Sequence, residues 1–144
     1  ISGAYKRYHC PMARTVFLGK EDQQKLDVMN KTIEALEEGK SAIKAGVTAD
    51  SVAQTFWKVL DKYNIKKDSR TGYSIGAGFP PDWGERTVNI SKGDPTVLQT
   101  NCTLHMIAVM QMGDWGVEVS EAMRVTDDGY EAFCNFPKEL VFKG

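Results

Sequence analysis

The chain has 144 residues, of which 42% are hydrophobic and 26% charged, and its formal net charge is −1 at pH 7. This composition is typical of a globular domain with one sizeable core. The balanced charge, without a cluster of Lys and Arg, argues against nucleic-acid binding. No apolar run approaches the roughly 18–20 residues of a membrane-spanning helix. Three cysteines without metal-site spacing favour a reducing, cytoplasmic location.

The first third of the chain predicts two extended stretches and a helix. Residues 1–8 and 13–18 are interpreted as extended, and Arg14-Thr-Val-Phe-Leu18 in the second stretch contains the β-branched and aromatic side chains typical of strands. Residues 21–44 carry apolar side chains at helical spacing. A second amphipathic helix is expected after Thr48, which is a plausible N-cap. Both apolar stripes are interpreted as faces that pack on a core.

The remainder of the chain predicts a loop followed by an antiparallel meander. Glycines and prolines are concentrated in residues 72–86, which indicates a long irregular loop of the kind that often carries function. Strands are expected at 103–112, 116–126 and 130–133. Strands, two helices, a loop and a meander define an α+β fold class. There is no repeat or linker, so residues 1–144 are expected to belong to one domain.

Three stretches, in this order and at this spacing, resemble a known family. They are Lys44-Ala-Gly-Val-Thr48, Gly72-Tyr-Ser-Ile-Gly76 and Val125-Thr-Asp-Asp-Gly-Tyr-Glu131. Together they look like the C-terminal half of the creatinase/aminopeptidase family, whose fold is called pita-bread. The resemblance covers essentially the whole chain. It implies two helices packed on a curved, mostly antiparallel sheet. It also implies that residues 1–144 are the C-terminal part of a catalytic domain whose N-terminal part is absent.

The resemblance also implies that the metal site of this family has been replaced. Metallopeptidases of the family bind two metal ions through Asp, His and Glu side chains. The matching positions here hold Pro11, Tyr73, Ile107 and Ser120, and a further catalytic His of the family matches Pro80. These side chains are unsuited to divalent metals. We therefore expect no metal and no cofactor.

Three further stretches are similar to the metal-independent branch of the family, and to ectoine hydrolase in particular. They are Tyr5-Lys-Arg-Tyr-His-Cys-Pro11, Gly78-Phe-Pro-Pro-Asp-Trp-Gly-Glu-Arg86 and Asp114-Trp-Gly-Val-Glu118. This similarity implies metal-independent hydrolysis of a C–N bond in a small charged substrate, such as a cyclic amidine or an amide. One alternative is a prolidase-like Xaa-Pro dipeptidase, which would need the metal. Another is a non-catalytic binding module on the same fold.

Candidate catalytic residues follow from strand alternation. His9, His105 and Glu118 each lie two residues before a replaced ligand, so each should share a face with the position of that ligand. Imidazole and carboxylate groups suit general acid–base catalysis. We predict that His105 and Glu118 are neighbours on adjacent strands and act as a pair. A structural role for each residue is the alternative.

Candidate substrate-binding residues are the phenol of Tyr73 and three side chains of the glycine-rich loop. Asp82 suits a cationic group, Trp83 an aromatic wall, and Arg86 a carboxylate. Loop anchoring explains these three equally well. Glu121 is a competing carboxylate, but placing it at the ligand position requires a one-residue shift that would turn the strand over. The expected partners are a small-molecule substrate and either a second copy of the chain or the absent N-terminal half.

Overall fold

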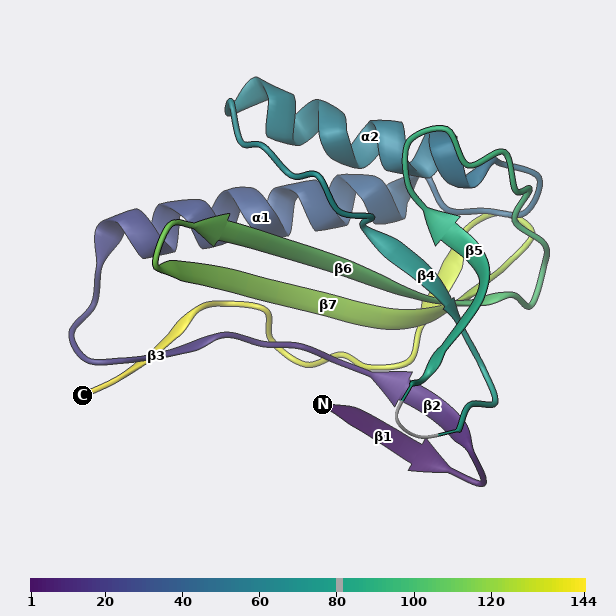
Figure 1. Cartoon of the computed structure of the whole chain (residues 1–144), viewed down its shortest axis with the longest axis horizontal. Helices are drawn as coiled ribbons and strands as arrows, with labels where there is room; N and C mark the ends of the chain where they lie inside the picture. Colours follow the sequence, from purple (N-terminus) through teal and green to yellow (C-terminus); the bar gives the residue numbers. More distant parts are fainter. Residues whose placement is uncertain (80–81) are drawn as a thin grey trace.

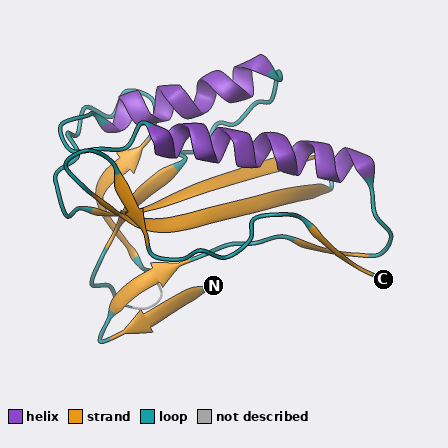
Figure 2. Cartoon of the chain, turned by 180° about the vertical axis from the view of Figure 1, so that it is seen from behind, coloured by secondary structure: helices purple, strands orange, loops and turns teal. Residues whose placement is uncertain are grey.

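The central feature of the fold is a five-stranded antiparallel sheet covered on one face by two helices (Figure 1). The computed structural model describes residues 1–79 and 82–144. Pro80, which matches a catalytic His of the family, lies outside the described residues. The strand order is β5-β4-β6-β7-β8, with β4 Gly72–Ile75, β5 Gly84–Ile90, β6 Thr103–Met112, β7 Trp115–Val125 and β8 Tyr130–Ala132. Seen from behind, the same two helices lie on one side of the strands (Figure 2).

Both predicted helices are confirmed, with shorter bounds for the first. Helix α1 spans Gln23–Ser41, and its N-cap Asp22 accepts hydrogen bonds from the amides of Gln24 and Lys25. Helix α2 spans Ala49–Lys62 and begins at the predicted N-cap, Thr48, which accepts from the amide of Ser51. These caps satisfy amides that have no partner within a helix. The helices are therefore fixed at their N-termini by local sequence.

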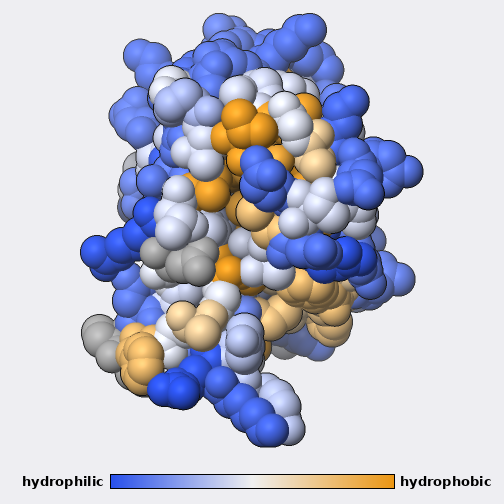
Figure 3. Space-filling view, turned by 90° about the vertical axis from the view of Figure 1, so that its right-hand side faces the viewer, coloured by the Kyte–Doolittle hydropathy of each residue, from blue (hydrophilic) through white to orange (hydrophobic). Residues whose placement is uncertain are grey.

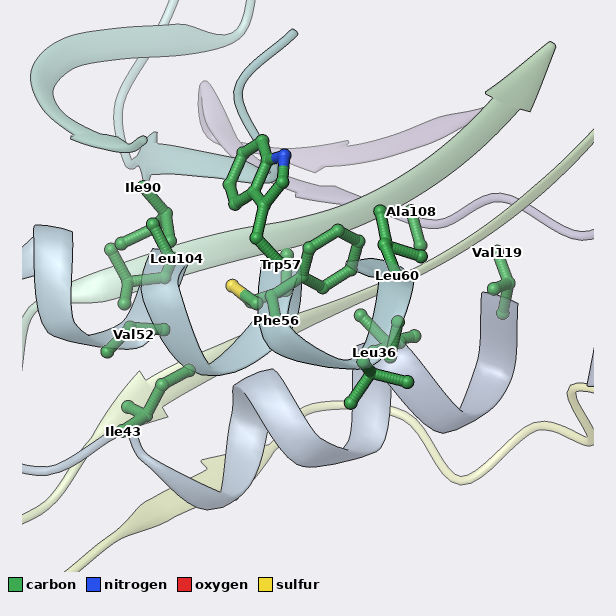
Figure 4. Close-up of a cluster of buried hydrophobic side chains, with 14 of the residues drawn as sticks. Leu36, Ile43, Val52, Phe56, Trp57, Leu60, Ile90, Leu104, Ala108 and Val119 are labelled. Carbon is green, nitrogen blue, oxygen red and sulfur yellow. The ribbon is translucent and has the colours of Figure 1, made fainter. Parts of the chain in front are cut away.

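The main hydrophobic core lies between the helices and the sheet (Figure 4). Leu36 of α1 and Phe56 of α2 are fully buried, and they face Leu104 of β6 and Val119 of β7, which are also fully buried. Alternation along β7 places the odd-numbered residues 117–125 on this core side, because each of them is buried. The even-numbered residues consequently face away from the helices.

The N-terminal segment forms a separate hairpin beneath the open face of the sheet (Figure 1). Strands β1 (Ser2–Tyr5) and β2 (Tyr8–Pro11) pair across a turn at Lys6 and Arg7, whose φ angles are 47° and 72°. The prediction of one extended stretch over 1–8 is therefore wrong in detail. Two positive φ angles define a tight hairpin turn that Asn-Gly usually signals, and Lys-Arg gives no such signal.

The last part of the N-terminal segment, just before α1, pairs with the C-terminal end of the chain. Strand β3 (Val16–Leu18) lies parallel to β9 (Val141–Lys143). The sequence analysis predicted β3 within residues 13–18 but did not predict β9. This pair joins two segments that are far apart in the sequence, a contact that local patterns do not reveal.

The prediction of one long irregular loop over residues 72–86 is wrong, because this stretch contains β4 and the beginning of β5. Residues 72–75 form β4 in the middle of the sheet, and β5 begins at Gly84. Gly72 sits where an added Cβ would lie 2.9 Å from Ile90 Cγ1 and 3.0 Å from the His105 carbonyl oxygen. This glycine therefore permits close packing in a strand and does not mark a loop.

No helix within residues 1–79 and 82–144 is long and apolar enough to cross a membrane.

Candidate functional site

A hydrogen-bonded chain of Tyr73, His105 and Ser120 crosses three adjacent strands on the face away from the helices. The register pairs Tyr73 with His105, and pairs Ile107, two residues beyond His105, with Ser120. His105 Nδ1 lies 2.8 Å from the Tyr73 hydroxyl, and His105 Nε2 lies 2.7 Å from Ser120 Oγ. The rings of Tyr73 and His105 meet edge to face, with centroids 5.1 Å apart. We call these three residues the relay.

Two further groups hold the ends of the relay. The indole N–H of Trp83 donates to the Tyr73 hydroxyl at 2.9 Å. At the other end, the backbone N–H of Ala13 donates to Ser120 Oγ at 2.8 Å. The relay is thus fixed by a loop residue on one side and by the segment between β2 and β3 on the other.

The relay is buried and electrically neutral. His105 is 3% exposed, Ser120 0% and Tyr73 9%. Burial lowers the pKa of His105 to about 4. Burial also raises the pKa of Tyr73. At neutral pH the imidazole is therefore unprotonated and the phenol protonated.

His9 lies on the hairpin and is not hydrogen-bonded to the relay. Its backbone N–H donates to the carbonyl of Gly76, and its Nδ1 lies 3.3 Å from the hydroxyl of Ser2. An added Cβ at Gly78 would lie 3.2 Å from the His9 ring, so the ring packs against this glycine. The catalytic role predicted for His9 stays a prediction.

Glu118 shares the open face with His105 but is not its neighbour. The register places Glu118 opposite Val109 and His105 opposite Ala122. Four residues of strand separate the two positions, which corresponds to about 13 Å. The prediction that they lie side by side is wrong, because Ala122 is opposite His105 and the hydroxyl of Ser120, two residues nearer than Glu118, contacts the His105 ring.

Glu118 instead lines an open cleft at the β6–β7 turn, together with Thr15 and Trp115. The hydroxyl of Thr15 bridges the backbone of Glu118, accepting from its N–H at 2.7 Å and donating to its carbonyl at 2.8 Å. Lys67 lies close enough to interact with it electrostatically. Burial lowers the pKa of Lys67 to about 8, while the negative charge of Glu118 acts in the opposite direction.

Glu121 lies on the opposite face of β7, on the helix side. Its carboxylate accepts hydrogen bonds from Lys40 and, at 2.9 Å, from Lys138, and Arg14 lies 3.8 Å away. The carboxylate is 3% exposed. Burial alone would raise the pKa of Glu121, but the hydrogen bonds from the two lysines lower it overall. This position contradicts a place for Glu121 beside the relay.

Asp82, just before β5, and Arg86, within β5, form an ion pair. The guanidinium donates to the Asp82 carboxylate at 2.6 Å and 3.2 Å, and Asp82 also accepts from the amide of Gly84 at 2.9 Å. The two side chains remain 48% and 76% exposed. The contacts favour loop anchoring over a substrate clamp. Trp83 alone of these predicted loop residues reaches the relay.

The relay does not fit a divalent metal. Its donors are a phenol, a hydroxyl and an imidazole with both nitrogens already in hydrogen bonds. In the described part of the chain, no group of three or more His, Cys, Asp or Glu side chains could hold a metal ion. Ile107, at the position of a family Glu, packs against Tyr73 and Ala122. The relay therefore offers one imidazole and no carboxylate, which is too few of the ligands that such ions require.

Sequence reasoning identified His105 and Tyr73 but treated Ser120 only as a lost ligand. The signal that could have found its role is the two-residue turn at Gly113-Asp114, which pairs Met112 with Trp115. Counting outward from this turn places Ser120 opposite Ile107 and therefore diagonal to His105. No local signal in the sequence indicated that Trp83 contacts Tyr73.

Two helices on one face of this antiparallel sheet, with polar residues on the other face, agree with the predicted half of a pita-bread fold. The structure of dipeptidase PepE from Mycobacterium ulcerans superposes with a TM-score of 0.88 at 23% identity, covering 98% of this chain and 38% of that one. Residues 1–127 match metallopeptidase family M24. The chain belongs to this family, which confirms the predicted creatinase/aminopeptidase resemblance.

Two relatives are similar over nearly the whole chain. Ectoine hydrolase from Halomonas elongata is 37% identical over 144 residues, which are 99% of this chain and 36% of the relative. An uncharacterised hydrolase/peptidase from Sinorhizobium fredii is 36% identical over 143 residues, again covering 99% of this chain and 36% of the relative. The chain thus spans about a third of the length of these relatives.

Proposed function

We propose that this protein is a hydrolase that cleaves a C–N bond of a small charged substrate without a divalent metal ion. The observation that carries the proposal is the neutral Tyr73–His105–Ser120 relay on the open face of the sheet. In the family resemblance, Tyr73 and Ser120 stand at positions where the metallopeptidases hold metal ligands. The similarity to ectoine hydrolase supports a cyclic amidine or amide-like substrate.

The charges around the relay suit a small substrate that carries charge. The guanidinium of Arg70 lies 4.5 Å from the centre of the Tyr73 ring. Both Arg70 and Glu118 act electrostatically on the Tyr73 hydroxyl. A positive and a negative group near one hydrogen-bonding centre can orient a substrate with both charges. We propose Glu118 and His9 as candidates for moving protons during hydrolysis.

The Xaa-Pro dipeptidase alternative rests on membership of metallopeptidase family M24. The likeness to dipeptidase PepE, at 23% identity, concerns the fold alone. The dipeptidase alternative requires metal ligands, and the relay offers poor ones. A non-catalytic binding module is compatible with the same loss of ligands. The following experiment distinguishes both alternatives from the proposed function.

The test is a hydrolysis assay on the whole protein. Three substrate types should be compared: ectoine as a cyclic amidine, creatine, and an Xaa-Pro dipeptide. Each is assayed with EDTA and with added Mn²⁺, Co²⁺ or Zn²⁺. We expect C–N hydrolysis of the cyclic amidine that EDTA leaves unchanged, and elemental analysis should find well under one metal equivalent. Dipeptide hydrolysis abolished by EDTA and restored by metal would establish the dipeptidase. Absence of turnover would favour a binding module.

A further inference from the structure

The direction of the hydrogen bonds in the relay follows from the position of Ser120. Its Oγ is fully buried and accepts from the N–H of Ala13 at 2.8 Å. Its one remaining polar contact in the described structure is His105 Nε2, at 2.7 Å. If Nε2 carried a proton and donated it to Ser120, the Ser120 hydroxyl proton would be buried without an acceptor, which costs free energy. Ser120 therefore donates to an unprotonated Nε2.

This assignment fixes the other side of the imidazole. A neutral His105 with an unprotonated Nε2 carries its proton on Nδ1. Nδ1–H then donates to the Tyr73 hydroxyl, 2.8 Å away. The indole of Trp83 can only donate, and it donates to the same oxygen at 2.9 Å. The Tyr73 oxygen thus accepts two hydrogen bonds, and its own O–H proton is left to donate to a further group. Because Tyr73 is 9% exposed whereas Ser120 is fully buried, a hydroxyl proton without an acceptor in the chain costs less on Tyr73 than on Ser120.

We propose that Tyr73 is the catalytic hydrogen-bond donor of the site, and that His105 is the positioning residue that turns the Tyr73 proton toward the substrate. This inference rests on the proposed hydrolase function. When water adds to a C=O or C=N carbon, negative charge develops on the oxygen or nitrogen. A fixed donor aimed at this charge stabilises the transition state. The Tyr73 proton stays on the phenol throughout, so no proton transfer is required of it.

The environment of each residue fits these roles. Burial raises the pKa of Tyr73, so the phenol remains a donor at neutral pH. Burial lowers the pKa of His105 to about 4, so the imidazole is a weak base there. Both of its nitrogens are also in internal hydrogen bonds. We therefore replace the general acid–base role predicted for His105 by a role in positioning the Tyr73 hydroxyl.

The first test is the tautomer of His105, which does not depend on activity. The sequence has two histidines, so ¹⁵N-histidine labelling gives two ring systems, and a His9→Gln variant assigns them. We expect His105 to carry its proton on Nδ1, with Nε2 unprotonated. A proton on Nε2 would reverse the direction of the relay and overturn the proposal. Replacing Tyr63 with Phe, which removes a hydroxyl bound to Glu34 on the helix side, should leave the His105 signals unchanged.

The second test separates positioning from general base catalysis in the whole protein. His105→Asn keeps an N–H near the Nδ1 position but has no basic group, whereas His105→Leu removes both. Positioning predicts that His105→Asn stays within about tenfold of wild-type kcat, and that His105→Leu loses about 10²-fold or more. Tyr73→Phe should lower kcat by about 10²–10³-fold with little change in KM, the scale for one oxyanion donor.

Three results would overturn the proposal: near-normal turnover of Tyr73→Phe, equal losses in His105→Asn and His105→Leu, or the reversed tautomer. Tyr63→Phe is the matched control, because it removes a tyrosine hydroxyl away from the relay and should retain activity. If the wild-type protein hydrolyses none of the substrates, the proposed function fails. The ¹⁵N spectrum still decides the direction of the relay in that case, so the two failures are distinguishable.

Discussion

At the scale of single residues, burial controls the protonation of His105 and links it to stability. The pKa of His105 is about 4 in the folded chain and about 6.5 in an unfolded one. Between these values the unfolded state binds more protons, so the free energy of unfolding rises with pH. The contribution is fully present above pH 6.5 and is lost as the pH falls toward 4. The shift corresponds to about 3 kcal/mol.

This linkage gives a stability prediction. Urea unfolding of the wild-type chain should show a free energy of unfolding that decreases from pH 7 to pH 4.5. In His105→Asn, which cannot titrate, the decrease should be smaller by about 2–3 kcal/mol. Comparing the two pH dependences removes the contribution of the carboxylates, which titrate in both proteins. Equal pH dependences would show that His105 does not have a lowered pKa.

A second residue-scale prediction concerns Lys67 and Glu118. Burial lowers the pKa of Lys67 to about 8, and the negative charge of Glu118 partly opposes this effect. Glu118→Gln should therefore lower the pKa of Lys67 further, because the burial remains and the opposing charge is gone. NMR titration of ¹⁵N,¹³C-lysine would measure the change. Glu38→Gln, which removes an exposed carboxylate of α1, is the control; a Lys67 pKa that rises or stays constant in Glu118→Gln contradicts the prediction.

At the scale of elements, the β6–β7 hairpin shows how far the sequence leads. Its strands were predicted nearly to the residue, because stretches rich in apolar and β-branched side chains lie on either side of a short turn. Gly113, with a φ of 77°, and Asp114 form that turn. The register follows once the turn length is known, and it pairs His105 with Ala122. Counting residues outward from the turn would therefore have predicted the contact between His105 and Ser120. The same count excludes a pairing of His105 with Glu118.

Other parts of the site depend on contacts that local patterns do not encode. The β1–β2 hairpin turns at Lys6-Arg7, and β5 contains Arg86 at a φ of 66° where the register shifts beside β4. Neither position holds the Gly or Asn that usually signals a positive φ. Trp83 reaches Tyr73 only because this irregular strand folds back on β4. The core elements were predictable, but the supports of the relay were not.

The buried ion cluster that joins α1 to β7 supplies an element-scale prediction. Lys40 of α1 is 2% exposed and Glu121 of β7 is 3% exposed. Burial alone would lower the pKa of Lys40, but its hydrogen bonds to Glu121 and Glu37 raise it overall. Lys40→Met should lower the free energy of unfolding by about 3 kcal/mol, because the Glu121 carboxylate loses a buried partner. Urea denaturation measures this change.

Lys62→Met is the matched control for Lys40→Met. Lys62 forms an ion pair with Glu34 at 3.0 Å, but its side chain is 61% exposed. Exposed pairs contribute little to stability. We therefore expect a much smaller loss for Lys62→Met, and equal losses in the two variants would show that burial of the Lys40–Glu121 pair does not matter.

At the scale of the whole molecule, apolar side chains remain exposed near the β1–β2 hairpin. Tyr5 is 75% exposed, Tyr8 67% and Phe79 68%. Tyr8 forms a β-bridge with Ala77, and the Arg7 guanidinium lies 4.9 Å from the centre of the Phe79 ring, so these residues belong to one region. Figure 3 shows one face of the molecule, where a small group of strongly hydrophobic residues lies near the middle among hydrophilic ones, with paler hydrophobic residues lower down. Exposed patches of this kind are typical of interaction surfaces.

We predict that this surface makes the chain self-associate. Among the described residues β1 pairs only with β2, which leaves its outer edge open to another strand. Light scattering of the 144-residue chain should give a mass above that of a monomer, rising with concentration. Tyr5→Lys should shift the equilibrium toward monomer, because it places a charge beside the open edge and removes an exposed ring. Gln54→Lys, which adds the same charge on the exposed side of α2, should not. A stable monomer at high concentration would contradict self-association, and the hairpin surface would then be expected to bind the remainder of a longer protein.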